Sequence, residues 1–400
     1  MRFILSFLFI FGCFSLSTWA APVTRIQITK SVKEDPSIYF SGIPGDSQLS
    51  NEISNFLRVC GWFALSNSKN ADYQLDGSFD GNFVKISLST SGMPIGAWKV
   101  SLKSSRRVIA KQLVDAIIQK CFKSLNVKGF CQSRILFCAQ TANGIRNLYS
   151  CDIDGKEIIQ HTFFPTLCVE PAWMPHGQSI VYSKYRPGGM DIIESTIALP
   201  QKSRILSSVK GINAGASISP NGKYMALILS PDHNVDLYIM NLQTKRRLRI
   251  TQNKAVEASP CWSPDGRKIA YVSDRTKGVP KIYIVDLSNY KHSILPTIGA
   301  DAVTPDWSSD NKIVYASRIG GTYTIAVYDT ITGKNSQVIK EQGKWESPAW
   351  AADNRQVVCK RQIAGNSELW IIDTWTGRTR QLLKTNYPLS MPVWSPCLAK

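Results

Sequence analysis

The clearest pattern in this chain is an apolar segment, centred on a large side chain, that recurs six times in the C-terminal two-thirds. Successive centres lie 43 to 45 residues apart, which is the length of one four-stranded blade of a β-propeller. The pattern therefore predicts a ring of six blades. The central positions are Trp173, Ile218, Trp262, Trp307, Trp350 and Trp394.

Each repeat alternates short apolar runs with turn residues. In the third repeat, Pro264-Asp-Gly266 predicts a type I turn, because Pro restricts φ and Gly accepts the positive φ that follows. The apolar run Ile269–Tyr271 comes next, and a polar connection separates it from Ile282–Asp286. A fourth, polar segment completes the unit. Four short strands bounded by turns indicate a blade, so the predicted fold class is mainly β.

The two ends of the repeat region complement each other. Strand-like runs at 134–137 and 148–152 precede the first Trp segment, whereas no such run follows the last segment, Pro392–Pro396. We therefore expect Pro392–Pro396 to supply the innermost strand of a composite sixth blade and to close the ring, which removes exposed sheet edges. The repeated Trp rings are predicted to pack between blades as core rather than to form a ligand cage.

Residues 21–128 lack the repeat, and their pattern predicts a small α+β domain. Apolar spacing indicates one helix from Leu49 to Cys60 and a second helix capped by Ser105. We place the domain boundary at Lys128–Gly129, so the six-bladed propeller is expected over residues 129–400. The strands expected in the α+β domain are Val23–Ile28, Ile38–Phe40, Tyr73–Leu75, Phe83–Leu88 and Trp98–Leu102.

Residues 1–20 have the features of a secretory signal peptide. A basic residue precedes the apolar run Phe3–Phe11, and small residues at Thr18 and Ala20 predict cleavage after Ala20. A loose lipobox, which would make Cys13 a lipid anchor, is the alternative. No other stretch approaches the roughly 20 apolar residues of a transmembrane helix. We therefore expect an exported protein that lies in the periplasm.

The formal net charge is +18, and one basic cluster stands at Lys245–Arg249. A nucleic-acid partner would require a basic stripe with interleaved exposed aromatic residues, and an exported propeller has little occasion to meet nucleic acid. We therefore expect no nucleic-acid partner and interpret the charge as a solvated basic surface. Attraction to anionic polymers or lipid head groups of a cell envelope stays open as a secondary role.

Ten cysteines are present, and an odd number remains once the signal peptide with Cys13 is removed. The absence of a Cys-x-x-Cys pair argues against a zinc ribbon or a thioredoxin-like redox motif. Several cysteines, such as Cys359, occupy strand positions that other repeats fill with apolar residues. We interpret them as small buried hydrophobic residues and leave their disulfide status open.

The sequence contains no motif for catalysis or for binding a metal or cofactor. There is no Gly-x-Ser-x-Gly elbow, and the four His residues lie in separate repeats without a second ligand at metal spacing. Asp152-Ile-Asp154-Gly155 resembles the start of a calcium loop, but the acidic residue expected further along is missing. An Asp-Gly hairpin turn is the simpler interpretation. We expect no catalytic residue, no metal and no cofactor.

Several motifs outside the repeat resemble those of the TolB family. Asn70–Gly77 is similar to the family's G-A-D-Y-x-x-x-G segment, and Phe56–Phe63 is similar to its L-x-x-S-G-x-F helix end. Arg107–Ile117 and Arg134-Ile135 follow the patterns R-x-x-A-H-x-x-x-D-x-I and G-x-F-x-T-R-I, and Pro392–Pro396 matches the terminal P-x-W-S-P. The resemblance covers essentially the whole chain after the signal peptide.

The resemblance implies a non-enzymatic periplasmic adaptor of the Tol-Pal system, which supports outer-membrane integrity and envelope constriction in cell division. It implies a monomer that reaches membranes only through its partners. In the family, the segment after the signal peptide binds TolA. The matching residues here are Ala21, Pro22, Val23, Thr24, Arg25 and Ile26.

The family's propeller binds the lipoprotein Pal around its central tunnel, on loops that lead into the innermost strands. A periplasmic propeller hydrolase or a glycan-binding protein is the alternative function. The residues that match the Pal-binding loops are Glu170, Asn213, Ala214, Gly215, Glu257, Ala258, Ser259, Thr304 and Glu346.

Overall fold

The computed structural model describes residues 35–123, 131–141, 144–198 and 202–396. The predicted signal peptide with Cys13, the expected TolA segment 21–26, the expected strand Val23–Ile28 and the proposed boundary Lys128–Gly129 lie outside these residues. The described residues from Asp35 onward belong to one compact unit.

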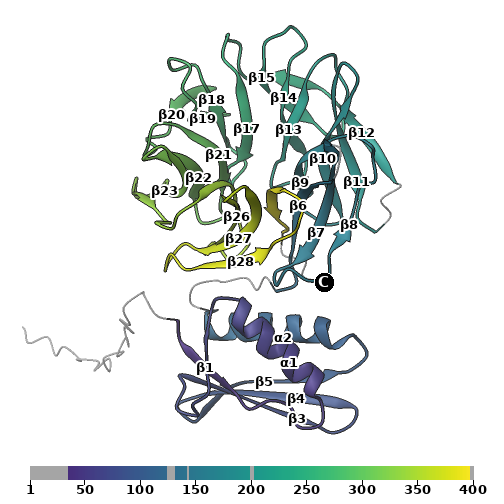
Figure 1. The fold of residues 1–400 in the computed structure, drawn as a ribbon, viewed down its shortest axis with the longest axis vertical. Coiled ribbons are helices and arrows are strands. Elements are labelled where there is room, and N and C mark those ends of the chain that lie inside the picture. Colours follow the sequence, from purple (N-terminus) through teal and green to yellow (C-terminus); the bar gives the residue numbers. More distant parts are fainter. Residues whose placement is uncertain (1–34, 124–130, 142–143, 199–201, 397–400) are drawn as a thin grey trace, which may run out of the picture. The chain divides into compact units, whose positions relative to one another are not determined.

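The first part of this unit is an α+β domain, as the sequence predicts. Its described residues form one sheet, in which β1 runs parallel to both β2 and β3, and β3, β4 and β5 are antiparallel. The helices α1 and α2 lie side by side next to this sheet (Figure 1). The elements are β1 (Ser37–Phe40), α1 (Ser47–Val59), β2 (Ala64–Ser66), β3 (Tyr73–Phe79), β4 (Phe83–Thr90), β5 (Met93–Ser101) and α2 (Arg106–Cys121).

Both helices begin where a polar side chain can accept a hydrogen bond from the free N–H groups of the first turn. Asp46 accepts from the N–H of Leu49, and Ser105 accepts from the N–H of Val108. The apolar stripe of α1, which includes Ile53 and Leu57, packs in one core with side chains from β3 and β4. The short strand β2 was not predicted, because three residues carry too little alternation to be recognised.

The remaining described residues form six four-stranded antiparallel sheets arranged around a central axis, so the predicted propeller is confirmed (Figure 1). From the innermost strand outward, the first three blades are β9 (Cys168–Trp173), β10 (Ser179–Arg186), β11 (Gly189–Thr196) and β12 (Ser203–Ser207); β13 (Asn213–Ile218), β14 (Tyr224–Leu229), β15 (Asp236–Asn241) and β16 (Arg247–Arg249); and β17 (Glu257–Trp262), β18 (Lys268–Ser273), β19 (Lys281–Asp286) and β20 (Lys291–Ile294).

The other three blades have the same order of strands. They are β21 (Ala302–Trp307), β22 (Lys312–Ile319), β23 (Thr322–Asp329) and β24 (Asn335–Gln337); β25 (Lys344–Trp350), β26 (Gln356–Ile363), β27 (Asn366–Asp373) and β28 (Thr379–Leu383); and β29 (Leu389–Trp394), β6 (Arg134–Gln140), β7 (Arg146–Asp152) and β8 (Ile159–Gln160).

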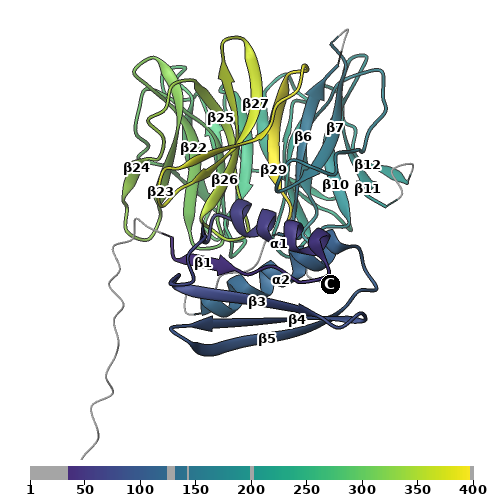
Figure 2. The ribbon, with the colours of Figure 1, turned by 60° about the horizontal axis from the view of Figure 1, so that its bottom comes forward.

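The sixth blade is the composite one that the sequence predicts. The C-terminal strand β29 pairs antiparallel with β6, with Leu389 opposite Ala139 and Trp394 opposite Ile135 (Figure 2). The N–H of Ser395 continues this pairing and donates to the carbonyl of Arg134 over 2.8 Å. The ring is therefore closed by hydrogen bonds between segments about 250 residues apart in the sequence.

The repeated Trp rings lie between adjacent blades, as expected. The indole Nε1 of Trp262 donates to the carbonyl of Ser217 in the preceding blade over 3.0 Å, and Trp350 donates in the same way to Asp306 over 3.1 Å. Both rings are buried. Trp307 is the exception, because it is only half-buried and its Nε1 has no hydrogen-bond partner among the described atoms.

The cysteines of the described residues behave as small apolar side chains, as predicted. Seven of these eight free cysteines are buried, and Cys121 is half-buried. Cys359 takes the strand position that Tyr271 and Tyr315 occupy in other blades. Burial raises the pKa of the Cys138 thiol to about 12, so this side chain stays a neutral thiol.

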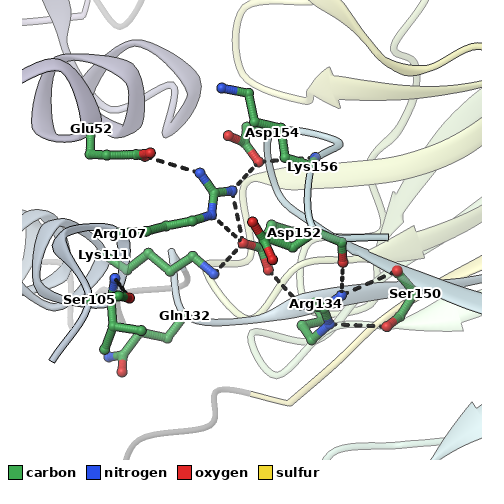
Figure 3. A network of polar contacts seen from close by, with 12 residues as sticks. Glu52, Ser105, Arg107, Lys111, Gln132, Arg134, Ser150, Asp152, Asp154 and Lys156 are labelled. Atoms are coloured by element: carbon green, nitrogen blue, oxygen red, sulfur yellow. Dashed lines mark hydrogen bonds and ion pairs between the residues drawn. The ribbon is translucent and has the colours of Figure 1, made fainter. Parts of the chain in front are cut away.

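A buried ion cluster joins α2 to the composite blade (Figure 3). The carboxylate of Asp152 is fully buried and pairs with Arg107 over 2.8 Å, with Lys111 over 2.5 Å and with Arg134 over 2.8 Å. Arg107 also pairs with Asp154 over 2.6 Å. The segment 152–155 is thus a hairpin turn whose two carboxylates bind cations.

A second set of contacts joins the end of α1 to the fifth blade. The indole of Trp62 donates to Asp353 over 3.1 Å, and the guanidinium of Arg355 lies 4.8 Å from the centre of the Trp62 ring. Arg355 in turn pairs with Asp35 over 2.6 Å. Polar and aromatic contacts therefore both hold the α+β domain on the propeller.

Candidate functional site

Every innermost strand of the propeller contains a β-bulge just before the repeated central position, which is Ile218 in β13 and Trp in the other five. In β17, Ala258 pairs with Val272 but Cys261 pairs with Ala270, so Ser259 and Pro260 together lie opposite one residue. The same shift occurs in the other five blades. A bulge bends the strand and turns its side chains toward a new direction.

The first residue of each bulge adopts a positive φ. For a residue other than Gly this conformation costs on the order of 1 kcal/mol or more, and such strain is concentrated at functional sites. Five of the six residues that follow are Pro, which is tolerated because the innermost strand is the edge of its sheet. The six bulge residues are Glu170 (53°), Gly215 (60°), Ser259 (48°), Thr304 (49°), Ser347 (52°) and Met391 (52°).

All six bulge residues line a central tunnel of about 590 Å³. The prolines that follow and the Trp residues are among the other residues that line it. A second pocket of about 310 Å³ shares Thr304, Ser347 and Met391 with the tunnel and also includes Glu346 and Lys360. The bulges therefore bring six short segments, far apart in the sequence, to one mouth, which we call the tunnel mouth.

The structure corrects the expectation that the predicted docking residues lie in loops. All nine lie within innermost strands, because each strand begins before the residue that suggested its start, which is Ala216 in the second blade and Pro in the others. Glu170, Gly215, Ser259 and Thr304 line the tunnel, and Glu346 lines the adjoining pocket.

The other four predicted residues lie one or two positions before the bulge residue of their strand and are less available to a partner. Asn213 and Glu257 are 0% and 1% exposed, Ala214 is buried and Ala258 is half-buried. Asn213 accepts hydrogen bonds from the Ser207 hydroxyl over 2.7 Å and from the N–H of Val209 over 3.0 Å. The Asn213 side chain therefore stabilises the connection between β12 and β13.

Glu257 has a comparable structural position in the third blade. It accepts from the Asn253 amide over 2.9 Å and pairs with Arg275 over 3.3 Å. Its other carboxylate oxygen is buried without a hydrogen-bond partner among the described atoms. Burial raises the pKa of Glu257, although Asn253 and Arg275 favour the ionised form.

Glu170 connects two neighbouring bulges at the tunnel mouth. Its carboxylate accepts from the Ser183 hydroxyl over 2.8 Å and from the N–H of Gly215, in the next blade, over 2.8 Å. Glu346 is held differently, by Lys344 over 2.8 Å and Lys360 over 2.9 Å. Burial opposes ionisation of Glu346, but the two lysines prevail and lower its pKa.

Among the tunnel-wall residues that the sequence did not predict as site residues, Ser347, Met391 and Asp306 are the most informative. Ser347 and Met391 stand three residues before their Trp, as Ser259 and Thr304 do, so the repeat offset would have found them. Asp306 directly precedes Trp307, and its carboxylate accepts from the N–H of Trp350 over 2.6 Å. No local signal marks Asp306, because the equivalent positions hold unrelated residues.

The pH dependence of stability should report on Asp306. Burial raises its pKa to about 6, against about 4 in an unfolded chain, although the N–H groups of Trp350 and Trp307 favour the ionised form. The stabilising contribution of the neutral acid is therefore complete below about pH 4 and is lost as the pH rises through about 6. Asp306→Asn should be compared with the original protein by urea unfolding across this range.

We expect the asparagine variant to gain stability relative to the original protein as the pH rises from about 4 to about 7. Asn can still accept the hydrogen bond from Trp350, so the fold should be retained. Two stability curves that run parallel over this range would contradict the assignment.

No helix in the described ranges is both long and apolar enough to cross a membrane. Within the same part of the chain, no group of three His, Cys, Asp or Glu side chains is arranged to hold a metal ion.

These features define a class: a six-bladed propeller with bulged inner strands, closed by its own C-terminal strand and preceded by a small α+β domain. The family profile described as "TolB beta propeller domain" matches residues 123–398. The chain belongs to the TolB family.

Curated relatives are similar in sequence over part of their length. "Tol-Pal system protein TolB" of Francisella tularensis subsp. holarctica (strain OSU18) is 39% identical over 256 residues, which cover 59% of this chain and 56% of that protein. "Protein TolB homolog" of Chlorobium chlorochromatii (strain CaD3) is 30% identical over 146 residues, or 36% and 32% of the two chains. The chain thus spans about half the length of the first relative.

Solved structures share the fold. TolB from Acinetobacter baumannii superimposes with a TM-score of 0.81 at 21% identity, over 91% of this chain and 97% of that one. The putative TolB from Agrobacterium tumefaciens gives a TM-score of 0.53 at 18% identity, over 64% and 89% of the two chains.

Proposed function

We propose that this protein is a non-enzymatic periplasmic adaptor of the Tol-Pal system. It binds a Pal-like lipoprotein at the tunnel mouth and TolA through residues 21–26, and so supports outer-membrane integrity and envelope constriction. Membership of the TolB family and the names of the curated relatives support this role. The observation that carries it is the ring of six left-handed bulge residues around one tunnel.

The chemistry of the tunnel mouth fits a protein partner. Exposed apolar side chains stand directly before two of the bulged strands, at Ile212 and Val256, which are 36% and 51% exposed. Glu170 and Glu346 add two carboxylates whose partners hold them in place. An apolar surface with a few oriented polar groups is typical of protein interfaces.

Blocking the tunnel mouth should weaken binding of the lipoprotein. We expect the double variant Ser259→Arg/Thr304→Arg to bind the periplasmic domain of the cell's own Pal-like lipoprotein at least about tenfold more weakly, because two long cations would occupy the tunnel. Affinity can be measured by calorimetry. The matched control is Thr332→Arg/Ser336→Arg, which adds the same charges at exposed positions on the outer part of the fourth blade.

Equal binding by both double variants would contradict docking at the tunnel mouth. Absence of any such lipoprotein among proteins crosslinked in the cell would contradict the adaptor role itself. Hydrolysis of peptides or glycans by the purified protein would favour the alternative of a propeller hydrolase.

A further inference from the structure

The basic cluster found in the sequence lies on the outer edges of the first two blades. We define the cationic rim as Lys202, Arg204, Lys223, Lys245, Arg246 and Arg247, all of which are exposed. Its residues come from the edge strands β12 and β16, from the position just before β12, from the turn before β16 and from the turn before β14. The tunnel mouth uses none of these residues.

Strand register places two of these cations on facing surfaces of neighbouring blades. Arg204 lies opposite Glu194, on the side of the first blade whose Ile192 packs against the second blade. Arg247 lies opposite Met240, a member of the same core cluster. Arg204 and Arg247 therefore lie on the sides of the two blades that face each other.

The turns of the second blade extend the positive charge. The N–H of Lys245 donates to the carbonyl of Asn241 over 2.9 Å, and the N–H of Leu242 donates to the carbonyl of Lys223 over 2.9 Å, so the two basic turns are adjacent. Partial desolvation and the nearby charges of Arg204 and Arg247 lower the pKa of Lys245, whereas Glu194 raises it. The cations are thus close enough to repel one another.

Few acidic groups neutralise this surface. Glu194 pairs with Arg204 over 2.7 Å, and Asp236 pairs with Arg249 at the end of β16. In the portion of the chain described here, Lys223, Lys245, Arg246 and Arg247 form no ion pair with an acidic side chain. An unpaired cluster of like charges attracts anionic partners.

Two large aliphatic side chains are exposed on the same edge strands as Arg204 and Arg247. Ile205 is 59% exposed and Leu248 is 49% exposed, and each lies between two neighbours of the same edge strand. Because side chains alternate along a strand, these two point to the sides opposite Arg204 and Arg247. Exposed aliphatic groups do not help to bind a hydrated polyanion, but they favour a lipid bilayer, where they can enter the boundary of the acyl chains.

We propose that the cationic rim docks on the surface of an anionic lipid bilayer. The basic side chains bind the phosphates of the head groups, while Ile205 and Leu248 enter the interface. This contact is direct and does not depend on a protein partner or on the tunnel mouth. It gives the protein's net charge of +18 a specific role on one surface.

Sedimentation with vesicles tests this proposal on the purified protein. We expect it to bind vesicles of phosphatidylcholine with about 30% phosphatidylglycerol and to leave pure phosphatidylcholine vesicles unbound. Each basic residue near such a surface is worth about a fivefold change in partitioning. The variant Lys245→Glu/Arg246→Glu/Arg247→Glu should therefore bind at least about 100-fold more weakly.

The matched control carries the same change in net charge at exposed lysines of the α+β domain: Lys69→Glu/Lys85→Glu/Lys103→Glu. It should retain most of the binding, and circular dichroism should show that both variants are folded. Equal loss in the two variants would overturn the proposal, since net charge alone would then explain the binding. Absence of binding by the original protein would overturn it as well.

A third variant separates a bilayer from a soluble polyanion. Ile205→Ser/Leu248→Ser keeps every charge and should lower vesicle binding about tenfold, because two buried aliphatic groups are lost at the interface. Its binding to polyphosphate should be unchanged. Vesicle binding that stays unchanged in this variant would overturn the lipid assignment.

Discussion

Removal of the closing strand, by ending the chain at Pro388, is expected to lower the melting temperature by more than about 10 °C or to leave an aggregating protein. The strand β29 is the innermost partner of β6, and its Trp394 is buried and donates to the Ser133 hydroxyl over 2.6 Å. Without β29, the ring is open and β6 exposes a free edge. Differential scanning calorimetry measures the effect.

A point variant makes this prediction more specific. Trp394→Ala should lower the free energy of unfolding by about 3–5 kcal/mol, as is usual for a buried aromatic ring. Trp307→Ala is the matched control, because Trp307 occupies the same position in its blade but is half-buried, and its Nε1 has no hydrogen-bond partner in the described part of the chain. We expect it to lose about 2 kcal/mol or less. Equal losses would contradict a special role for ring closure.

Removal of the carboxylate at the centre of the ion cluster should be similarly severe. Asp152→Ala is expected to lower the free energy of unfolding by about 3–5 kcal/mol, because it leaves Arg107, Lys111 and Arg134 close together and without their shared anion. Urea unfolding measures the effect, with circular dichroism as the signal. The loss should be smaller if Lys111→Ala is added, since this removes a cation whose ion pair among the described residues is with Asp152.

Asp232→Ala provides the control for this experiment. The Asp232 side chain is 68% exposed and lies 3.7 Å from Arg249, so its ion pair is open to solvent. Such pairs contribute about 1 kcal/mol or less. If Asp152→Ala were as mild as Asp232→Ala, the cluster would contribute little to holding the α+β domain on the propeller.

The repeat was sufficient to predict the propeller because the same local pattern occurs six times in the sequence. A spacing of 43 to 45 residues, with turn residues at constant offsets, matches a unit of four short strands. Counting strands at both ends also predicted the pairing of β29 with β6. This long-range contact could be predicted because the first strands of the repeat region lacked an innermost strand, and the last segment lacked the strands that follow it in other repeats.

The sequence was less informative about the candidate site. Residues at the predicted positions divide into a tunnel-lining group, such as Ser259 and Thr304, and a buried group, such as Asn213 and Glu257. The division depends on the bulge. It adds one residue to each innermost strand relative to its partner strand, and so changes the direction in which the side chains point. In the sequence, the Pro after the bulge residue suggests that a loop ends there. The innermost strands were therefore predicted to begin at this Pro, although they begin before it.

The amino-acid sequence by itself determined the class of fold, the number of blades, the closure of the ring and the caps of the helices, because each depends on periodicity or on local hydrogen bonding. Only the tertiary structure decided that Asp152 gathers three cations, that six left-handed residues meet at one tunnel mouth, and that Arg204 and Arg247 lie on facing sides of neighbouring blades. These features join residues from different strands and blades. Their distances and burial are set by packing, which no local pattern encodes.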